Sequence, residues 1–224
     1  MKHPLTILLF AALLCGVSPL AMAQRSPMPS RYDVAPEAYE HVYLDLVQDF
    51  RSMLIDVGNG QYVGQVDGHH ILYGYGQFIN NDGNTVIGKF RRGELLQGIS
   101  LGKDNVTVGN KDHYCSYSLS TGRLEYIYDH GKAITPDASQ AADYTFMTMT
   151  FSNGDSYVGE LYRGQRHGLG IYYYATGGVW YGGYKGGIRS GFGAWFKPGN
   201  DMLIGQWDGD DERRSIYIPM KQGR

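Results

Sequence analysis

The sequence predicts an all-β protein built from consecutive antiparallel β-hairpins. Three observations support this prediction: a repeat of 23 residues, an alternation of side-chain types within each repeat, and an unusual composition. The 224 residues include 32 glycines and 19 tyrosines, which suit short strands and tight turns better than helices. One repeat array of this length requires no second domain.

The 23-residue repeat is clearest between residues 155 and 207. Each unit begins with a large apolar residue, has a glycine two positions later, and has a second large apolar residue two positions after the glycine. The first and last of these positions are occupied by Tyr157 and Leu161, Trp180 and Tyr184, and Leu203 and Trp207. A fixed period of this length indicates stacked copies of one supersecondary unit, each contacting mainly its neighbours.

Within one unit, the alternation of side chains predicts a strand. Tyr157, Gly159 and Leu161 share one face of this strand, and the residues between them share the other. After a glycine-rich turn, residues 169–174 are rich in β-branched and aromatic side chains, which favours a second strand. Each unit is therefore predicted to be a hairpin, in which the mid-strand glycine leaves a gap for a ring from the adjacent hairpin.

This pattern resembles the MORN repeat, whose units read roughly Tyr-x-Gly, an aromatic residue two positions on, a glycine, and then His-Gly-x-Gly. The matching residues are Tyr157-Val158-Gly159, Gly164 and His167-Gly168-Leu169-Gly170 in one unit, and Trp180-Tyr181-Gly182, Tyr184, Gly187 and Gly191-Phe192-Gly193 in the next. Ser190 replaces the histidine in the second unit. The resemblance implies an elongated single-layer sheet of hairpins that serves association rather than catalysis, and lipid binding is claimed for some family members.

The resemblance and the composition together predict six segments. These are a signal peptide (residues 1–23), a lead with a capping helix (24–57), degenerate MORN-like repeats (58–103), divergent hairpins with an enlarged loop (104–152), MORN-like repeats (153–218) and a tail (219–224). The enlarged loop, residues 134–142, is a candidate recognition element because a rigid scaffold would present it.

The first 23 residues have the pattern of a secretory signal peptide. A short, weakly positive start precedes an apolar run over residues 5–17, and Ala21-Met22-Ala23 is a small-x-small cleavage site. The run is too short to span a bilayer comfortably. We therefore expect cleavage after Ala23 and export across the inner membrane of a bacterium into the periplasm or cell envelope.

Residues 36–50 are predicted to form a short amphipathic helix. Apolar residues recur at helical spacing after Pro36, and the helix would cover the open end of the hairpin array. The alternative is a helix that binds a membrane surface or a partner. Anionic lipid would repel its polar face, which carries Glu37, Glu40, Asp45 and Asp49.

Charge and cysteine content exclude several classes of protein. Residues 24–224 carry 19 basic and 22 acidic side chains, a formal charge of −3, whereas a nucleic-acid binder usually has a basic excess. Cys115 is the one cysteine after the cleavage site, so no internal disulfide can form there. We expect it to be a buried thiol, with an intermolecular disulfide as the alternative.

The sequence predicts no enzyme, no cofactor and no metal site. It lacks a Gly-x-Ser-x-Gly elbow, a phosphate-binding Gly-x-x-x-x-Gly-Lys-Ser/Thr loop and a His-Glu-x-x-His zinc motif. The His69-His70 pair and His113 with Cys115 do not reach three ligands locally, and we interpret them as strand or turn residues. The acidic residues 208–212 are interpreted as a solvated turn rather than a calcium loop.

The predicted binding surface is the repeated aromatic face together with basic residues in equivalent turns. It comprises Tyr157, Leu161, Trp180, Tyr184, Trp207, Arg166 and Arg189. We expect the ligand to be a protein partner or a second copy of the chain, or an anionic lipid surface, with no nucleic acid. A glycan or cell-wall polymer is the alternative, because rings in tandem hairpins can stack on sugars. Rings that bind should be partly exposed in the free protein.

Overall fold

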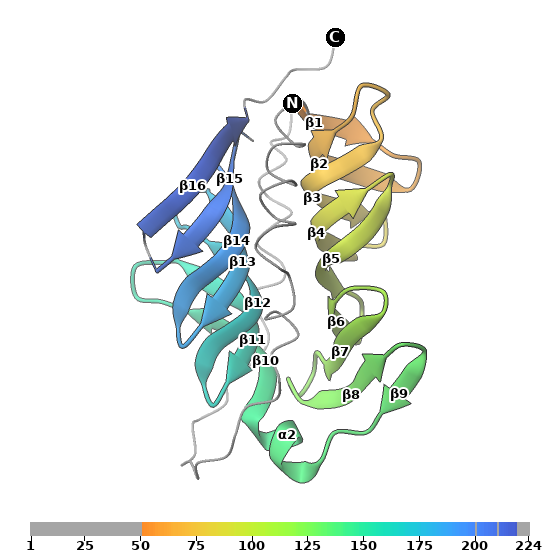
Figure 1. Cartoon of the computed structure of the whole chain (residues 1–224), viewed down its shortest axis with the longest axis vertical. Coiled ribbons are helices and arrows are strands. Elements are labelled where there is room, and N and C mark those ends of the chain that lie inside the picture. Colours follow the sequence, from red (N-terminus) through yellow and green to blue (C-terminus); the bar gives the residue numbers. More distant parts are fainter. Residues whose placement is uncertain (1–50, 200, 210, 219–224) are drawn as a thin grey trace.

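The computed structural model describes residues 51–199, 201–209 and 211–218 (Figure 1). These residues are almost entirely antiparallel β-structure, which confirms the all-β prediction and the consecutive hairpins. The predicted signal peptide and the predicted helix at residues 36–50 lie outside the described residues. Among the residues described, no helix is long and apolar enough to cross a membrane.

The strands form two sheets in which each strand pairs with the next one in the chain. The first sheet contains β1 (Arg51–Asp56), β2 (Gly60–Val66), β3 (Leu72–Asn80), β4 (Thr85–Arg91), β5 (Glu94–Leu101), β6 (Asn105–Gly109), β7 (His113–Ser118), β8 (Leu124–Asp129) and β9 (Lys132–Ile134). The second contains β10 (Tyr144–Thr150), β11 (Ser156–Tyr162), β12 (Gln165–Tyr173), β13 (Val179–Lys185), β14 (Ile188–Phe196), β15 (Met202–Asp208) and β16 (Asp211–Ile218). Neither sheet has a crossover.

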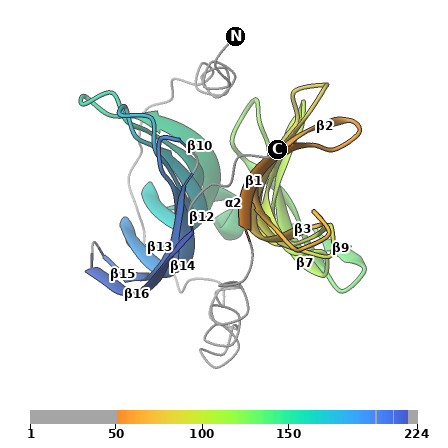
Figure 2. The same cartoon turned by 90° about the horizontal axis from the view of Figure 1, so that it is seen from above.

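The two sheets lie face to face (Figures 1 and 2), so the expectation of a single layer needs correction. One hydrophobic cluster draws buried side chains from both sheets, among them Tyr75, Ile99 and Tyr117 from the first and Ile171 and Tyr181 from the second. The physical reason is that the strands of both sheets are apolar on two faces. A single layer would leave one of those faces in water.

The predicted alternation within the first repeat unit is confirmed in β11. Tyr157 and Leu161 lie in a cluster on the outer face of the second sheet, whereas Val158 belongs to the core between the sheets. Glu160, on the same face as Val158, is 2% exposed and accepts a hydrogen bond from the Tyr117 hydroxyl of the first sheet (2.7 Å). One strand therefore supplies an outer aromatic face and an inner core face.

The mid-strand glycines are covered by rings, but not by rings from the adjacent hairpin. The Tyr157 ring lies over Gly159 of its own strand and over Gly170 of the paired strand, where an added Cβ would come within 2.5 Å and 2.3 Å of it. The Trp180 ring covers Gly182 and Gly193 in the same way. In each hairpin, the ring of the aromatic residue two positions before the glycine lies over its own hairpin. It can do so because two glycines face one another across the paired strands and neither has a side chain to hold the ring away.

The same arrangement occurs in the first sheet, where Tyr62 lies over Gly64 and Gly76. The Tyr62 hydroxyl donates to the backbone oxygen of Gln65 (2.9 Å), as the Tyr157 hydroxyl donates to that of Glu160 (2.8 Å). Each phenol therefore finds an acceptor three residues later in its own strand.

The predicted enlarged loop at residues 134–142 overlaps a short helix, α2 (Ala138–Asp143), that leads from the first sheet to the second. Asp137 caps it: its carboxylate accepts from the backbone N–H of Gln140 (2.9 Å), and the Gln140 side chain accepts from the Asp137 N–H (3.0 Å). The Arg163 guanidinium donates to Asp143 (3.0 Å) and ties the end of α2 to the second sheet. The loop is thus a fixed connection between the sheets.

Candidate functional site

Five of the seven predicted binding residues meet on the outer face of the second sheet. Tyr157, Leu161, Trp180, Tyr184 and Trp207 form one hydrophobic cluster, in which Trp180 and Trp207 meet edge to face with 4.4 Å between ring centroids. Their side chains are between 0% and 5% exposed. The expectation that these rings are partly exposed is therefore wrong, and the residues form the floor of the face rather than its surface.

A second set of residues packs against this floor and is open to solvent in part. It consists of Met147, Met149, Phe151, Tyr172, Tyr174, Trp195 and Leu203. Tyr174 and Trp195 contact one another with 5.8 Å between ring centroids, and Phe151 stacks on Tyr172 at 5.6 Å. The 23-residue period could have identified two residues of this set, because Tyr172 and Trp195 are one period apart in the sequence.

Arg166 lies among the aromatic rings of the outer face. Its guanidinium carbon is 5.2 Å from the ring centroid of Tyr184, 5.8 Å from that of Tyr172 and 5.9 Å from those of Tyr157 and Phe151. It also donates to the backbone oxygen of Gly187. Cation–π attraction to several rings fixes the direction in which this guanidinium points.

Arg189 occupies the equivalent position one repeat later, 23 residues after Arg166. Its guanidinium carbon lies 5.4 Å from the Trp180 ring centroid, and its Nη1 donates to the Tyr174 hydroxyl (3.4 Å). The repeat therefore places two cations on the same aromatic face, and they lie near the start of β12 and β14 rather than in turns as the sequence predicted.

The two arginines line one hollow of about 290 Å³ on this face. The remaining lining residues are Tyr172, Tyr174, Tyr184, Gly187, Ile188 and Gly209, so the described residues around it include two cations and no carboxylate. We call this hollow the arginine pocket. Its lining favours an anionic group with an apolar or planar attachment.

A larger hollow of about 590 Å³ opens between turns of the two sheets and includes Asp56, Asn81, Lys197 and Pro198 in its lining. Its two charged side chains are of opposite sign, and the rest of the lining is largely glycine, aliphatic and amide groups. It offers no convergent set of chemical groups, so we assign the candidate site to the smaller arginine pocket.

Three tyrosines of the face, Tyr157, Tyr172 and Tyr184, stay protonated at physiological pH. Burial raises the pKa of Tyr184, although the nearby Arg166 acts in the opposite direction. Burial, and then the hydrogen bond to Asp155, raise the pKa of Tyr172 to about 12. Burial likewise raises the pKa of Tyr157 well above its ordinary value. These three phenols therefore add no negative charge to the face, and they act as hydrogen-bonding groups.

His69, His70 and Cys115, which the sequence analysis considered as possible metal ligands, lie apart from this face. Cys115 is fully buried in the core between the sheets, in accordance with the expected buried thiol. His69 and His70 are exposed in the turn after β2, where the His69 N–H donates to Asp67 (2.8 Å). The acidic turn at residues 208–212 includes residue 210, which is outside the described part of the chain.

Comparison with known proteins identifies one repeat unit. The MORN repeat family model matches residues 157–179, which span the first of the two units recognised in the sequence. A comparison with curated proteins finds no match.

Among solved structures, the chain is similar to BamB from Moraxella catarrhalis, with 10% identity, coverage of 75% of this chain and 76% of that chain, and a TM-score of 0.19. It is also similar to the WD40 domain of SCAP from fission yeast, with 6% identity, coverage of 77% and 46%, and a TM-score of 0.16. Both scores are too low to support an argument about fold or function. Residues 157–179 therefore form a MORN repeat, and the packing of Tyr157 on Gly159 and Gly170 lies within it.

Proposed function

We propose that the chain is a non-catalytic interaction module that binds an acidic segment of a partner protein on the outer face of its second sheet. The observation that supports this proposal is the arginine pocket, in which Arg166 and Arg189 lie one repeat apart around a single hollow. A pair of fixed guanidinium groups suits carboxylates, which accept two parallel hydrogen bonds from each.

The composition of the face supports a protein ligand. Tyr172, Tyr174 and Trp195 are half-buried, so they offer apolar area and hydroxyl groups with little conformational freedom to lose. Interfaces are enriched in Tyr, Trp and Arg, and a few such residues usually provide most of the binding energy. The fully buried Trp180 would hold this surface in place, whereas Tyr184 lines the arginine pocket and would contact the ligand there.

We also propose that the partner is met outside the cytoplasm. The motivation is the predicted signal peptide over residues 1–23, which would deliver residues 24–224 to the periplasm or cell envelope. N-terminal sequencing of the protein from an envelope fraction tests this: Gln24 as the first residue supports export, whereas an intact Met1 contradicts it.

Two other ligands fit parts of the same face. An anionic lipid headgroup would satisfy the two arginines, and a glycan could stack on Tyr174 and Trp195, whose rings contact one another. The lipid reading predicts binding to vesicles without any protein partner. The glycan reading predicts binding that does not depend on the arginines.

The experiment measures binding of residues 24–224 to an immobilised glutamate-rich peptide, to anionic vesicles and to isolated peptidoglycan. We expect salt-sensitive binding to the peptide, weakened at least about tenfold by the double substitution Arg166→Gln and Arg189→Gln. Arg91→Gln, at an exposed position in the first sheet, is the matched control and should leave binding unchanged. Equal peptide binding by the double variant, or elution of the wild-type chain from peptidoglycan by free sugar, would contradict the proposal.

A further inference from the structure

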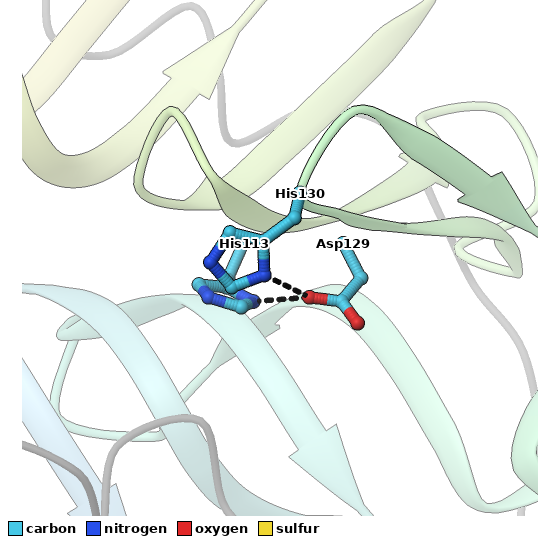
Figure 3. Close-up of side chains that lie close together, drawn as sticks. All are labelled: His113, Asp129 and His130. Atoms are coloured by element: carbon cyan, nitrogen blue, oxygen red, sulfur yellow. Dashed lines mark hydrogen bonds and ion pairs between the residues drawn. The ribbon is translucent and has the colours of Figure 1, made fainter.

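Three side chains with metal-ligating atoms converge at the end of the β7–β8 pair where β7 begins and β8 ends. Nδ1 of His113 lies 2.8 Å from Oδ1 of Asp129, and Nδ1 of His130 lies 3.0 Å from the same oxygen (Figure 3). The two imidazole rings are nearly perpendicular, with 4.1 Å between their centroids. One ligand atom from each residue lies within 4.8 Å of the other two.

Backbone geometry explains this convergence. His113 and Asp129 are directly opposite one another in the β7–β8 ladder. His130 and Gly131 then form the two-residue turn between β8 and β9, both with positive φ (42° and 85°), as a type I′ hairpin requires. The His130 N–H also donates to the backbone oxygen of Asp112 (2.8 Å), which fastens the turn beside β7.

The sequence alone did not suggest this group, because it associated His113 with Cys115. Cys115 is two residues further along β7 and is fully buried between the sheets, and it does not belong to the converging group. The missing ligands lie 16 and 17 residues after His113 and are brought to it by strand pairing. Local spacing of histidines and cysteines cannot reveal a site of this kind.

We propose that His113, Asp129 and His130 form a binding site for a divalent transition-metal ion of the Zn²⁺ class. Two imidazole nitrogens and one carboxylate oxygen are ligands that Zn²⁺ accepts, and three protein ligands leave a coordination position for water or an external group. The side chains are 38%, 48% and 72% exposed for His113, Asp129 and His130, so an ion can reach them from solvent.

The distances fit such an ion. Four ligands at about 2.0 to 2.1 Å in a tetrahedron are separated from one another by about 3.3 Å. The two nitrogen–oxygen distances, 2.8 and 3.0 Å, are slightly shorter than that value. All three ligand atoms lie within 4.8 Å of one another. Small rotations of side chains on a fixed turn would therefore complete the site, and each metal-bound nitrogen would release its proton.

The alternative is that the three residues form only an exposed ion pair with shared hydrogen bonds, which would add little to stability. The two interpretations differ in what a metal does. A metal site should bind Zn²⁺ at micromolar concentrations and resist thermal unfolding more strongly when Zn²⁺ is present, because binding to the folded state stabilises it. An ion pair alone would show neither effect.

The experiment uses residues 24–224 without a polyhistidine tag, treated with chelator and titrated with ZnCl₂ by calorimetry. We expect one ion per chain and a higher midpoint of thermal unfolding. His130→Asn and Asp129→Asn should each weaken binding more than about 100-fold, because loss of an outer hydrogen-bond partner alone costs 10- to 100-fold. Asparagine tolerates the positive φ of residue 130, so His130→Asn should keep the turn.

The double variant His69→Ala and His70→Ala is the matched control, because it removes two exposed histidines from a turn of the same sheet. It should bind Zn²⁺ as the wild-type chain does. Circular dichroism confirms that each variant is folded before titration. The proposal is overturned if the wild-type chain takes up no Zn²⁺, or if His130→Asn and Asp129→Asn bind it as tightly as the wild type.

Discussion

At the scale of single residues, the repeat depends on a ring that lies flat on two glycines. Tyr157 is fully buried because neither Gly159 nor Gly170 has a side chain to hold it away from the sheet. The Tyr62 ring has the same relation to Gly64 and Gly76. The glycines therefore act as partners of an aromatic ring, and that requirement accounts for their fixed spacing.

Replacing Gly159 by alanine should expel this ring. The added Cβ would lie 2.5 Å from the Tyr157 hydroxyl and 2.6 Å from the Cα of Gly170, so the tyrosine would lose its hydrogen bond to Glu160. We expect a loss of about 1 to 3 kcal/mol in the free energy of unfolding, measured by urea denaturation. Gly68→Ala, at an exposed site with nothing within 4 Å, is the control. Equal effects of the two substitutions would contradict the packing argument.

Asp155 gives the fold a specific response to acid. Its carboxylate accepts hydrogen bonds from the Ala175 N–H (2.7 Å), the Tyr172 hydroxyl (2.8 Å) and the Asn153 side chain (2.7 Å). These bonds, that from Ala175 foremost, lower the pKa of Asp155 below its ordinary value of 3.8. A carboxyl whose folded pKa is depressed stabilises the fold above pH 3.8, and that contribution is lost as the pH falls through the folded pKa.

Asp155→Asn should therefore cost about 1 to 2 kcal/mol at pH 7, and the difference from the wild type should shrink at pH 3. Urea midpoints of the two proteins at both pH values provide the measurement. Asp82→Asn, at an exposed turn position, serves as the control and should show no such difference. A cost for Asp155→Asn that is the same at both pH values would exclude this role.

At the scale of strands, two bulges, at Gln65 and Glu160, lie three residues after a tyrosine, and the side chain of the bulged residue closes each of them. Gln65 accepts from the Tyr75 N–H (2.8 Å) in the first sheet, and Glu160 accepts from the Leu169 N–H (3.0 Å) in the second. Glu160 alone goes further, because its other carboxylate oxygen accepts from Tyr117 across the interface. One side chain thus links a strand irregularity to the packing of two sheets.

Glu160→Ala should destabilise the protein by about 2 to 4 kcal/mol, because it removes the acceptor of two buried donors. Glu160→Gln should cost less, since its amide can serve both groups. A double-mutant cycle with Tyr117→Phe, measured by denaturation, gives the strength of the link between the sheets. Additive effects of the two substitutions would show that the sheets are not coupled through this pair.

The strand pattern was predictable from sequence, and the surface of the site was not. Alternation placed Tyr157 and Leu161 on one face, and the structure confirms it. Alternation gives the side of a sheet but not the depth of a side chain, because depth depends on what covers it. Trp180 lies between its ladder partners Tyr172 and Trp195, and this packing appears only when neighbouring strands are placed together.

At the scale of the whole molecule, the decisive feature is the single core between two sheets. The sequence predicted that Val158 and Glu160 lie on the face of their strand opposite to Tyr157. It contained no local signal that a second sheet would cover that face. The partners lie far away in the chain: Tyr181 contacts the Tyr75 ring at 6.1 Å. Pairing between sheets has no fixed sequence period, so a repeat pattern cannot predict it.

The shared core predicts that both sheets unfold together, and the chain carries a natural probe for this. Its three tryptophans, Trp180, Trp195 and Trp207, all belong to the second sheet, so their fluorescence reports that sheet, whereas far-ultraviolet circular dichroism reports both. We expect the same urea midpoint by both methods, because either sheet alone would expose its half of the core to water. Tyr181→Ala, which removes a ring that is 2% exposed, should shift both midpoints downward together by about 3 kcal/mol or more in unfolding free energy. A fluorescence transition that precedes or follows the circular-dichroism transition would mean instead that the two sheets are independent units joined by α2.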